Sequence, residues 1–339
     1  MVSQQMKRFL SVLLLLLSAC SFPGERSATP ALATESPISP VASAVPQPTA
    51  QIGTEANPVI LALAPSPHPA AEMIEAGEFL AGRLEELTGY QVVTVAPASE
   101  ADIVNAFRPG NAHVAVLSPF GYLLALHNGD ASTALASLRI GQTLYGAQFI
   151  ARRDAGFESY FDPLHGENLA DASQALAQFR DKKPCWTDTI SPSGYVVPLG
   201  FLKEAGVEVR SPAFLEGQAP VVRAVYGKGI CDFGATFIDA RELPALEADY
   251  PDVMEKVDVI WRIPAIIPYE QVVMSSSLTP DMRRALLRAF VDLMTTPEGV
   301  DAMQTVYSLE SLQPAEDVQY EAFAQYVQNA GIDLHMLLK

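Results

Sequence analysis

Residues 185–195 read Cys-Trp-Thr-Asp-Thr-Ile-Ser-Pro-Ser-Gly-Tyr and lead directly into the apolar run VVPLGFL at 196–202. This order is typical of a strand end, a turn of small polar residues and the start of a helix. Ser191 and Ser193 offer hydroxyls beside the free N–H groups of the helix start, and Gly194 permits close approach of the backbone to a ligand. The stretch therefore favours binding of an anion. The alternative is that the two serines only cap the helix.

The same order of strand, polar turn and helix recurs along the chain. Apolar runs of strand length end near Leu63, Leu117 and Phe233, and Ser66, Ser118 and Thr236 follow them. Strands that alternate with helices predict βαβ units on parallel sheets, and ligands of such sheets bind beyond the carboxyl ends of the strands. We therefore expect these three hydroxyl residues to converge with the turn at 191–194.

Two apolar stretches with polar interruptions, at 144–151 and 257–274, flank the second strand–helix block. They predict two crossings between lobes, with the chain returning to the first lobe for its last helices. The expected fold is therefore α/β and two-lobed, with a mainly parallel sheet flanked by helices in each lobe. Lobe 1 is assigned to 57–148 plus 262–339, and lobe 2 is inserted at 149–261.

The N-terminal region predicts export and anchoring. Residues 1–19 combine Lys7 and Arg8 with an apolar core too short to span a membrane, which is typical of a secretory signal. The residues before Cys20 resemble a bacterial lipobox, so we expect lipidation of Cys20; an ordinary signal peptide with a chance cysteine is the alternative. Residues 20–56 are rich in Pro, Ser, Thr and Ala and predict a disordered tether.

Charge and cysteine content narrow the classes of partner. The formal net charge of −17 argues against nucleic acid and anionic membrane surfaces as partners, but not against a small anion in a cleft with its own local field. With Cys20 assigned to lipid, Cys185 and Cys231 are predicted to form a disulfide in an oxidising compartment; two buried thiols are the alternative. The sequence has no CxxC and five scattered histidines, so no metal or cofactor is expected.

Several motifs together resemble the substrate-binding proteins of phosphate, phosphite and phosphonate ABC transporters. They are Ser191–Tyr195 followed by Val-Val-Pro198, His113–Ser118, the crossing Gly141–Ile150, Gly229–Thr236 and Val259–Pro264. The similarity runs in order over residues 57–305. It implies a two-lobed periplasmic-binding-protein fold of type II and a tetrahedral oxoanion held by Ser191, Ser193, Gly194 and Tyr195. Pro192 stands where the family often has a hydroxyl residue.

Three further positions, Gln218, Asp239 and Tyr145, are candidate ligand contacts. The resemblance places Gln218 where the family commonly has a histidine. Asp239 follows a strand and can accept a proton-bearing ligand oxygen, or it can cap the helix that starts at Ala240. Tyr145 and Tyr195 offer apolar faces with a hydroxyl, and ordinary core packing is their alternative role.

These residues predict a monomeric extracytoplasmic lipoprotein that captures a small oxoanion in an inter-lobe cleft and delivers it to an ABC permease. The alternatives are a clamshell that senses its ligand for a membrane receptor, and a binder of a different small organic solute. An enzyme is not expected, because Ser193 lies in Ser-Pro-Ser-Gly rather than in a Gly-x-Ser-x-Gly elbow.

Overall fold

The computed structural model describes residues 50–65 and 71–338, which form one compact unit that contains two large β-sheets and one two-stranded sheet. The predicted signal peptide, Cys20 and Ser66 lie outside the described residues. Residues just before the expected boundary at 57 already contact the folded part of the chain. Gly53 packs against Tyr90, and its carbonyl accepts the N–H of Gln91 at 2.9 Å.

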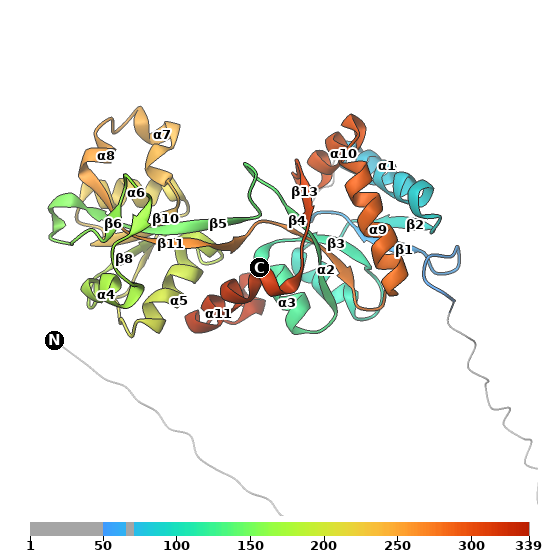
Figure 1. The fold of residues 1–339 in the computed structure, drawn as a ribbon, viewed down its shortest axis with the longest axis horizontal. Helices are drawn as coiled ribbons and strands as arrows, with labels where there is room; N and C mark the ends of the chain where they lie inside the picture. Colours follow the sequence, from blue (N-terminus) through green and yellow to red (C-terminus); the bar gives the residue numbers. More distant parts are fainter. Residues whose placement is uncertain (1–49, 66–70, 339) are drawn as a thin grey trace, which may run out of the picture. The chain divides into compact units, whose positions relative to one another are not determined.

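The first sheet has six strands, in the order β13 (Leu312–Pro314), β4 (Ala131–Ser137), β12 (Gln271–Ser275), β3 (Val114–Leu117), β1 (Val59–Ala62) and β2 (Val92–Val95). Side chains alternate across it, as the period of a strand requires. Val114 and Val116 join one apolar cluster, whereas Ala115 and Leu117 join another. Both faces of the sheet are therefore covered (Figure 1).

Five helices cover this sheet. They are α1 (Ala71–Thr88), α9 (Pro280–Leu293) and α10 (Pro297–Tyr307) in one apolar cluster, and α2 (Glu100–Phe107) and α3 (Pro119–His127) in the other. Their starts follow local rules of capping. The hydroxyls of Ser99, Thr279 and Thr296 each accept a backbone N–H in the first turn of α2, α9 and α10.

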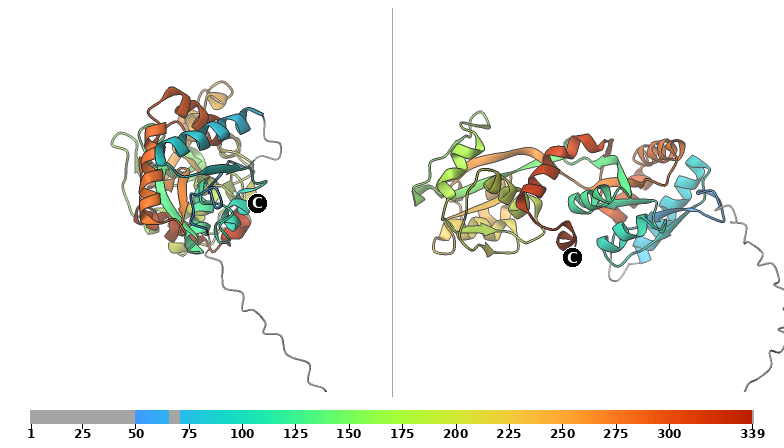
Figure 2. Two further views of the ribbon diagram at one scale, coloured as in Figure 1. Left: turned by 90° about the vertical axis from the view of Figure 1, so that its right-hand side faces the viewer. Right: turned by 90° about the horizontal axis from the view of Figure 1, so that it is seen from below.

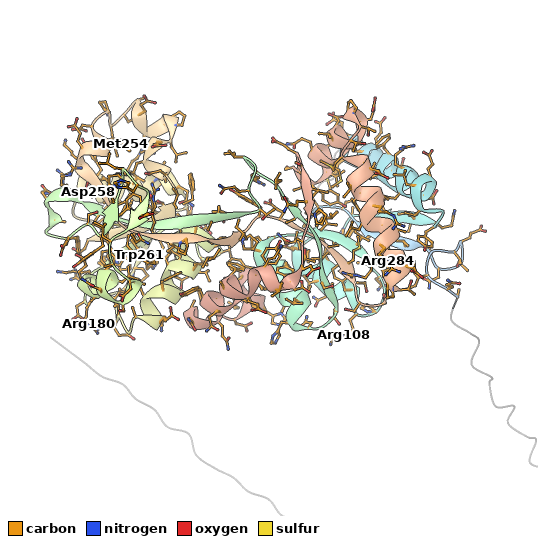
Figure 3. The ribbon with its side chains drawn as sticks, viewed as in Figure 1. Arg108, Arg180, Met254, Asp258, Trp261 and Arg284 are labelled. Atoms are coloured by element: carbon orange, nitrogen blue, oxygen red, sulfur yellow. A yellow bond between two sulfur atoms is a disulfide. The ribbon has the colours of Figure 1, made fainter. Side chains whose placement is uncertain are left out.

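The second sheet has five strands, in the order β11 (Val257–Pro268), β5 (Leu144–Arg152), β10 (Phe233–Phe237), β8 (Pro184–Trp186) and β9 (Ala213–Phe214). Around it lie α4 (Ala172–Leu176), α5 (Val197–Glu204), α6 (Gln218–Gly227), α7 (Pro244–Glu247) and α8 (Val253–Lys256). A short hairpin of β6 (Phe161–Asp162) and β7 (Glu167–Asn168) stands beside the sheet. Trp261 of β11 packs against Phe201 of α5 with ring centroids 5.4 Å apart (Figure 3).

The expectation of two α/β lobes joined by two crossings is confirmed, but the sheets are mixed rather than mainly parallel. Parallel pairing holds for β1 with β2 and β3, and for β8 with β9 and β10. The two predicted crossings are long strands, β5 and β11, that pair antiparallel with each other. β12 likewise runs antiparallel to β3, because the chain enters the first sheet from the opposite end on its return.

The chain passes between the sheets at 138–143 and 269–270. These two connections are hydrogen-bonded to their neighbours: Tyr269 N–H donates to the Thr143 carbonyl at 3.2 Å, and Ser137 N–H donates to the Glu270 carbonyl at 2.9 Å. The hinge is therefore a double connection held by backbone hydrogen bonds.

Helix α11 (Glu321–Ala330) makes a further link that the sequence did not suggest. Tyr326 stacks on Phe201 of α5 at 3.6 Å between ring centroids, and Phe323 stacks on Phe120 of α3 at 5.9 Å. Gly200 is required here, because a Cβ would lie 2.1 Å from the Tyr326 carbonyl oxygen. Helix α11 thus contacts helices that flank both sheets (Figure 2).

Buried His113 gives stability a predictable dependence on pH. Its Nδ1 accepts the Ile60 N–H at 3.0 Å, and burial lowers the pKa of the imidazole below its usual 6.5. Below about pH 6.5 the unfolded chain takes up a proton that the folded chain resists, so the free energy of unfolding falls as the pH falls. Urea unfolding at pH 7.5 and 5.5 should show this loss.

The variant His113→Asn is the control for this prediction. Its amide oxygen can accept the Ile60 N–H but does not titrate, so the difference between the two pH values should shrink. An unchanged difference in the variant would assign the pH dependence to other groups.

Candidate functional site

The candidate site is a cleft of about 830 Å³ between the two sheets. The first lobe contributes Pro119, Ser137, Gln304, Ser308 and Glu310; the second contributes Ser191, Pro192, Ser193, Gln218, Phe237 and Ile238; the two connections and the ends of β5 and β11 beside them contribute Arg139, Ile140, Tyr145, Pro268, Tyr269 and Glu270. Four of the residues predicted from sequence therefore line one cleft: Ser191, Ser193, Gln218 and Tyr145.

The serine turn, which begins at Ser191, forms one turn of π-helix, Pro192–Val196, before α5 begins. The Ser191 hydroxyl accepts the Gly194 N–H at 3.0 Å, so its own proton stays available to donate. Ser193 is buried to 3% exposure and still lines the cleft. Since Pro192 has no N–H and that of Gly194 is used by Ser191, the groups that the turn can offer to a ligand are mainly its hydroxyls.

Gly194 lies behind the turn rather than on the cleft wall. A Cβ on Gly194 would meet the Thr187 hydroxyl at 2.1 Å, and the Gly194 carbonyl accepts the Thr187 N–H at 3.2 Å. The glycine therefore lets the turn close onto the end of β8. Its role is to position Ser191 and Ser193.

Tyr145 adds a third hydroxyl to the same wall. It lines the cleft together with Ser193, and burial raises the pKa of its phenol well above the usual value of 10. The phenol therefore stays protonated at neutral pH and can donate a hydrogen bond. The Tyr145 ring stacks on Tyr269 with centroids 4.8 Å apart, which fixes its orientation.

Gln218 lies at the start of α6 with its amide partly engaged. Its Oε1 accepts the Phe237 N–H at 3.1 Å, which leaves the amide NH₂ to face the cleft. The Gln218 side chain thus joins β10 to α6 and supplies neutral donors.

Ser118 is held by the protein's own carboxylate. The Ser118 hydroxyl donates to Glu100 at 2.8 Å, its backbone N–H donates to the other carboxylate oxygen, and its oxygen accepts the Gly121 N–H. Burial raises the pKa of the Glu100 carboxyl, while the two bonds from Ser118 oppose the rise. Glu100 thus occupies the start of α3, where the sequence placed a ligand, and it is the neighbouring Pro119 that lines the cleft.

Thr236 lies inside β10 rather than in a loop after it, because the strand continues to Phe237. The Thr236 side chain is fully buried, and its hydroxyl donates to the Phe237 carbonyl at 3.0 Å. Phe237 and Ile238 take its expected place on the cleft wall.

Asp239 caps the 3₁₀ turn Ala240–Glu242, the alternative role suggested by the sequence. Its carboxylate pairs with Arg241 at 2.7 Å and accepts the Gln148 amide at 2.9 Å. Burial raises the pKa of this carboxyl, but the hydrogen bond and charge of Arg241 outweigh that effect and hold it below its usual value. Asp239 is therefore an ionised structural residue and does not line the cleft.

The Tyr195 side chain also packs against other aromatic rings and does not line the cleft. Its ring lies against Trp186 and Phe214, with centroids 5.9 and 5.0 Å apart.

The expected disulfide is present between Cys185 and Cys231, whose Cα atoms are 5.6 Å apart. It ties the end of β8, just before the serine turn, to the segment that enters β10.

Several cleft residues escaped the sequence analysis. Arg139 and Glu270 lie in the connections between the sheets, and the flanking apolar crossings had indicated that region. Gln304, Ser308 and Glu310 lie at and beyond the end of α10, where no pattern marks a site.

Within the described residues, no cluster of three or more His, Cys, Asp or Glu is placed to hold a metal ion. The same residues contain no helix long and apolar enough to cross a membrane.

Two α/β lobes joined by two connections, with a cleft between them, are typical of a solute-binding protein of the periplasmic type. Residues 63–320 match the family model described as ABC transporter, phosphonate, periplasmic substrate-binding protein. Since this match covers most of the chain, the protein belongs to that family.

Individual relatives are more distant. The phosphate-import protein PhnD of Mycolicibacterium smegmatis is 30% identical over 167 residues, which are 45% of this chain and 47% of that protein. The match thus spans about half the length of that relative. The structures of XAC2383 from Xanthomonas citri bound to chloride ion and to ATP have TM-scores of 0.56 and 0.57 at 16% and 15% identity. Each match covers 80% of this chain, and the two matches cover 97% and 96% of the respective Xanthomonas chains. At such low sequence identity these matches show the fold alone.

Proposed function

We propose that this protein captures a small tetrahedral oxoanion of the phosphate, phosphite or phosphonate class in the inter-lobe cleft and delivers it to an ABC permease. The observation that carries the proposal is the convergence of three hydroxyls, those of Ser191, Ser193 and Tyr145, on one wall. Hydroxyls that donate from a wall shielded from water bind an oxoanion strongly, because the local dielectric constant is low.

Membership of the phosphonate-binding family supports the ligand class. The Mycolicibacterium relative is named as a phosphate-import protein, which supports delivery of the anion to a transporter. We further propose that Cys20 carries the lipid anchor and that the chain acts as a monomer on the extracytoplasmic side. The lobe boundaries given above stay predictions.

Calorimetry with phosphate, phosphite and methylphosphonate tests the ligand class. We expect at least one of the three anions to bind. The absence of heat with all three would exclude this ligand class and would favour a different organic solute.

Ser193→Ala should weaken that binding about 10- to 100-fold, because it removes a donor to a charged ligand. Ser173→Ala is the matched control, since Ser173 belongs to the second lobe but bonds Asp171 at the start of α4. Equal affinity of the wild type and Ser193→Ala would show that the serine turn does not hold the anion.

A further inference from the structure

Arg139 is the single cation among the described side chains that line the cleft. Glu270 and Glu310 are the carboxylates of the same wall, so the charged residues of the wall sum to a net negative charge. A negative wall opposes entry of an anion. The contacts of Arg139 therefore decide whether its positive charge is available to an anion in the cleft.

Arg139 and Glu270 lie in different connections between the sheets, and they pair with each other. The Arg139 Nη2 and Glu270 Oε2 atoms are 2.9 Å apart. The guanidinium carbon lies 5.3 Å from the centre of the Tyr269 ring, which stacks on Tyr145. Tyr145 in turn lines the cleft together with Ser193, so neighbouring side chains lead from the cation toward the serine turn.

The ion pair between Arg139 and Glu270 is weak enough for a ligand to replace Glu270. The side chains of Arg139 and Glu270 are 46% and 33% exposed, and ion pairs with such access to water are weak. Glu270 contacts the guanidinium through one nitrogen, whereas a guanidinium presents five donors in a planar fork. An oxoanion with several oxygens can use two of these donors at once, so it satisfies the fork better than Glu270 does.

We infer that the bound oxoanion displaces Glu270 from Arg139, so that Arg139 supplies the positive charge of the site and Glu270 is an internal competitor for it. The inference rests on the proposed function and assigns a specificity-determining role to two hinge residues. A monoanion or dianion of tetrahedral shape gains from the exchange, whereas a neutral solute has nothing with which to replace Glu270.

Three single variants test this exchange by calorimetry with inorganic phosphate, phosphite and methylphosphonate. Arg139→Gln should bind the anion about 10- to 100-fold more weakly. Glu270→Gln should bind it about threefold to fivefold more tightly, because it frees Arg139. Glu310→Gln is the matched control, since it removes a second carboxylate of the same wall that forms no ion pair among the described residues.

A double variant and a stability measurement complete the design. In the Arg139→Gln background, Glu270→Gln should no longer tighten binding, and thermal unfolding of every variant separates binding from folding. The exchange is overturned if Arg139→Gln binds as the wild type does, or if Glu270→Gln and Glu310→Gln tighten binding equally. Failure of the proposed function gives a different result, in which neither wild type nor any variant binds an oxoanion.

Discussion

Replacing Gly194 by alanine is expected to abolish oxoanion binding and to lower the free energy of unfolding by about 3 kcal/mol. The added Cβ would lie 2.1 Å from the Thr187 hydroxyl and 2.4 Å from its methyl carbon. Thr187 is fully buried and cannot move into solvent. The turn must therefore shift away from β8, which removes Ser191 and Ser193 from their places on the cleft wall.

Urea unfolding and calorimetry measure the two effects of this substitution. Gly82→Ala in α1 is the matched control, because its Cβ meets nothing within 4 Å and alanine suits a helix. A Thr187→Ala background should rescue part of both losses, since the nearest contact of the new Cβ would then be 2.8 Å. Normal binding by Gly194→Ala alone would contradict the close packing of the turn on β8.

Reducing the disulfide is expected to lower the free energy of unfolding by about 4 kcal/mol. The bond between Cys185 and Cys231 closes a sequence separation of 46 residues, and breaking it restores that loop's freedom to the unfolded chain. Cys185 is also fully buried in an apolar cluster with Val221 and Val225. The effect should appear as a lower midpoint in denaturant unfolding with reductant present.

Cys231→Ser provides the control for this measurement. Cys231 is only partly buried, so the serine is tolerated there better than at Cys185. The variant should match the reduced wild type and should not respond to reductant. If the wild type unfolds at the same denaturant concentration with and without reductant, the disulfide does not stabilise the fold.

Local patterns predicted much of the architecture. Apolar runs bounded by Ser, Gly and Pro indicated the strands, and the alternation of these runs with helical periodicity indicated two α/β lobes. Of the two predicted crossings, 257–274 contains the observed connection at 269–270, whereas 144–151 begins just after the connection at 138–143, and both stretches consist mainly of strands. A connecting segment and a strand can have the same apolar composition, so sequence alone could not show that β5 and β11 pair with each other along the second sheet.

The candidate site was predicted only in part, because local sequence does not show which side chains meet from distant parts of the chain. A helix start contains Ser191 and Ser193, and Tyr145 lies near the beginning of β5. Both places can be recognised from the residues next to them in the sequence. Thr236 and Asp239 have equally suitable sequence contexts, yet the structure places both in hydrogen bonds with the Gln148 amide, 88 and 91 positions away in the sequence. What separates these two groups is the set of long-range neighbours, which no local pattern contains.

The sequence by itself determined the α/β class and the serine turn, because each depends on residues close together. It favoured the pair Cys185 and Cys231 only with Cys20 assigned to lipid, and the structure shows that disulfide. Only the tertiary structure decided which polar groups are already used. Glu100 comes from one helix to occupy Ser118 at the start of another, and Arg139 meets Glu270 across 131 positions of sequence. Such pairings depend on where the chain returns in space, and the chemistry of the cleft depends on them.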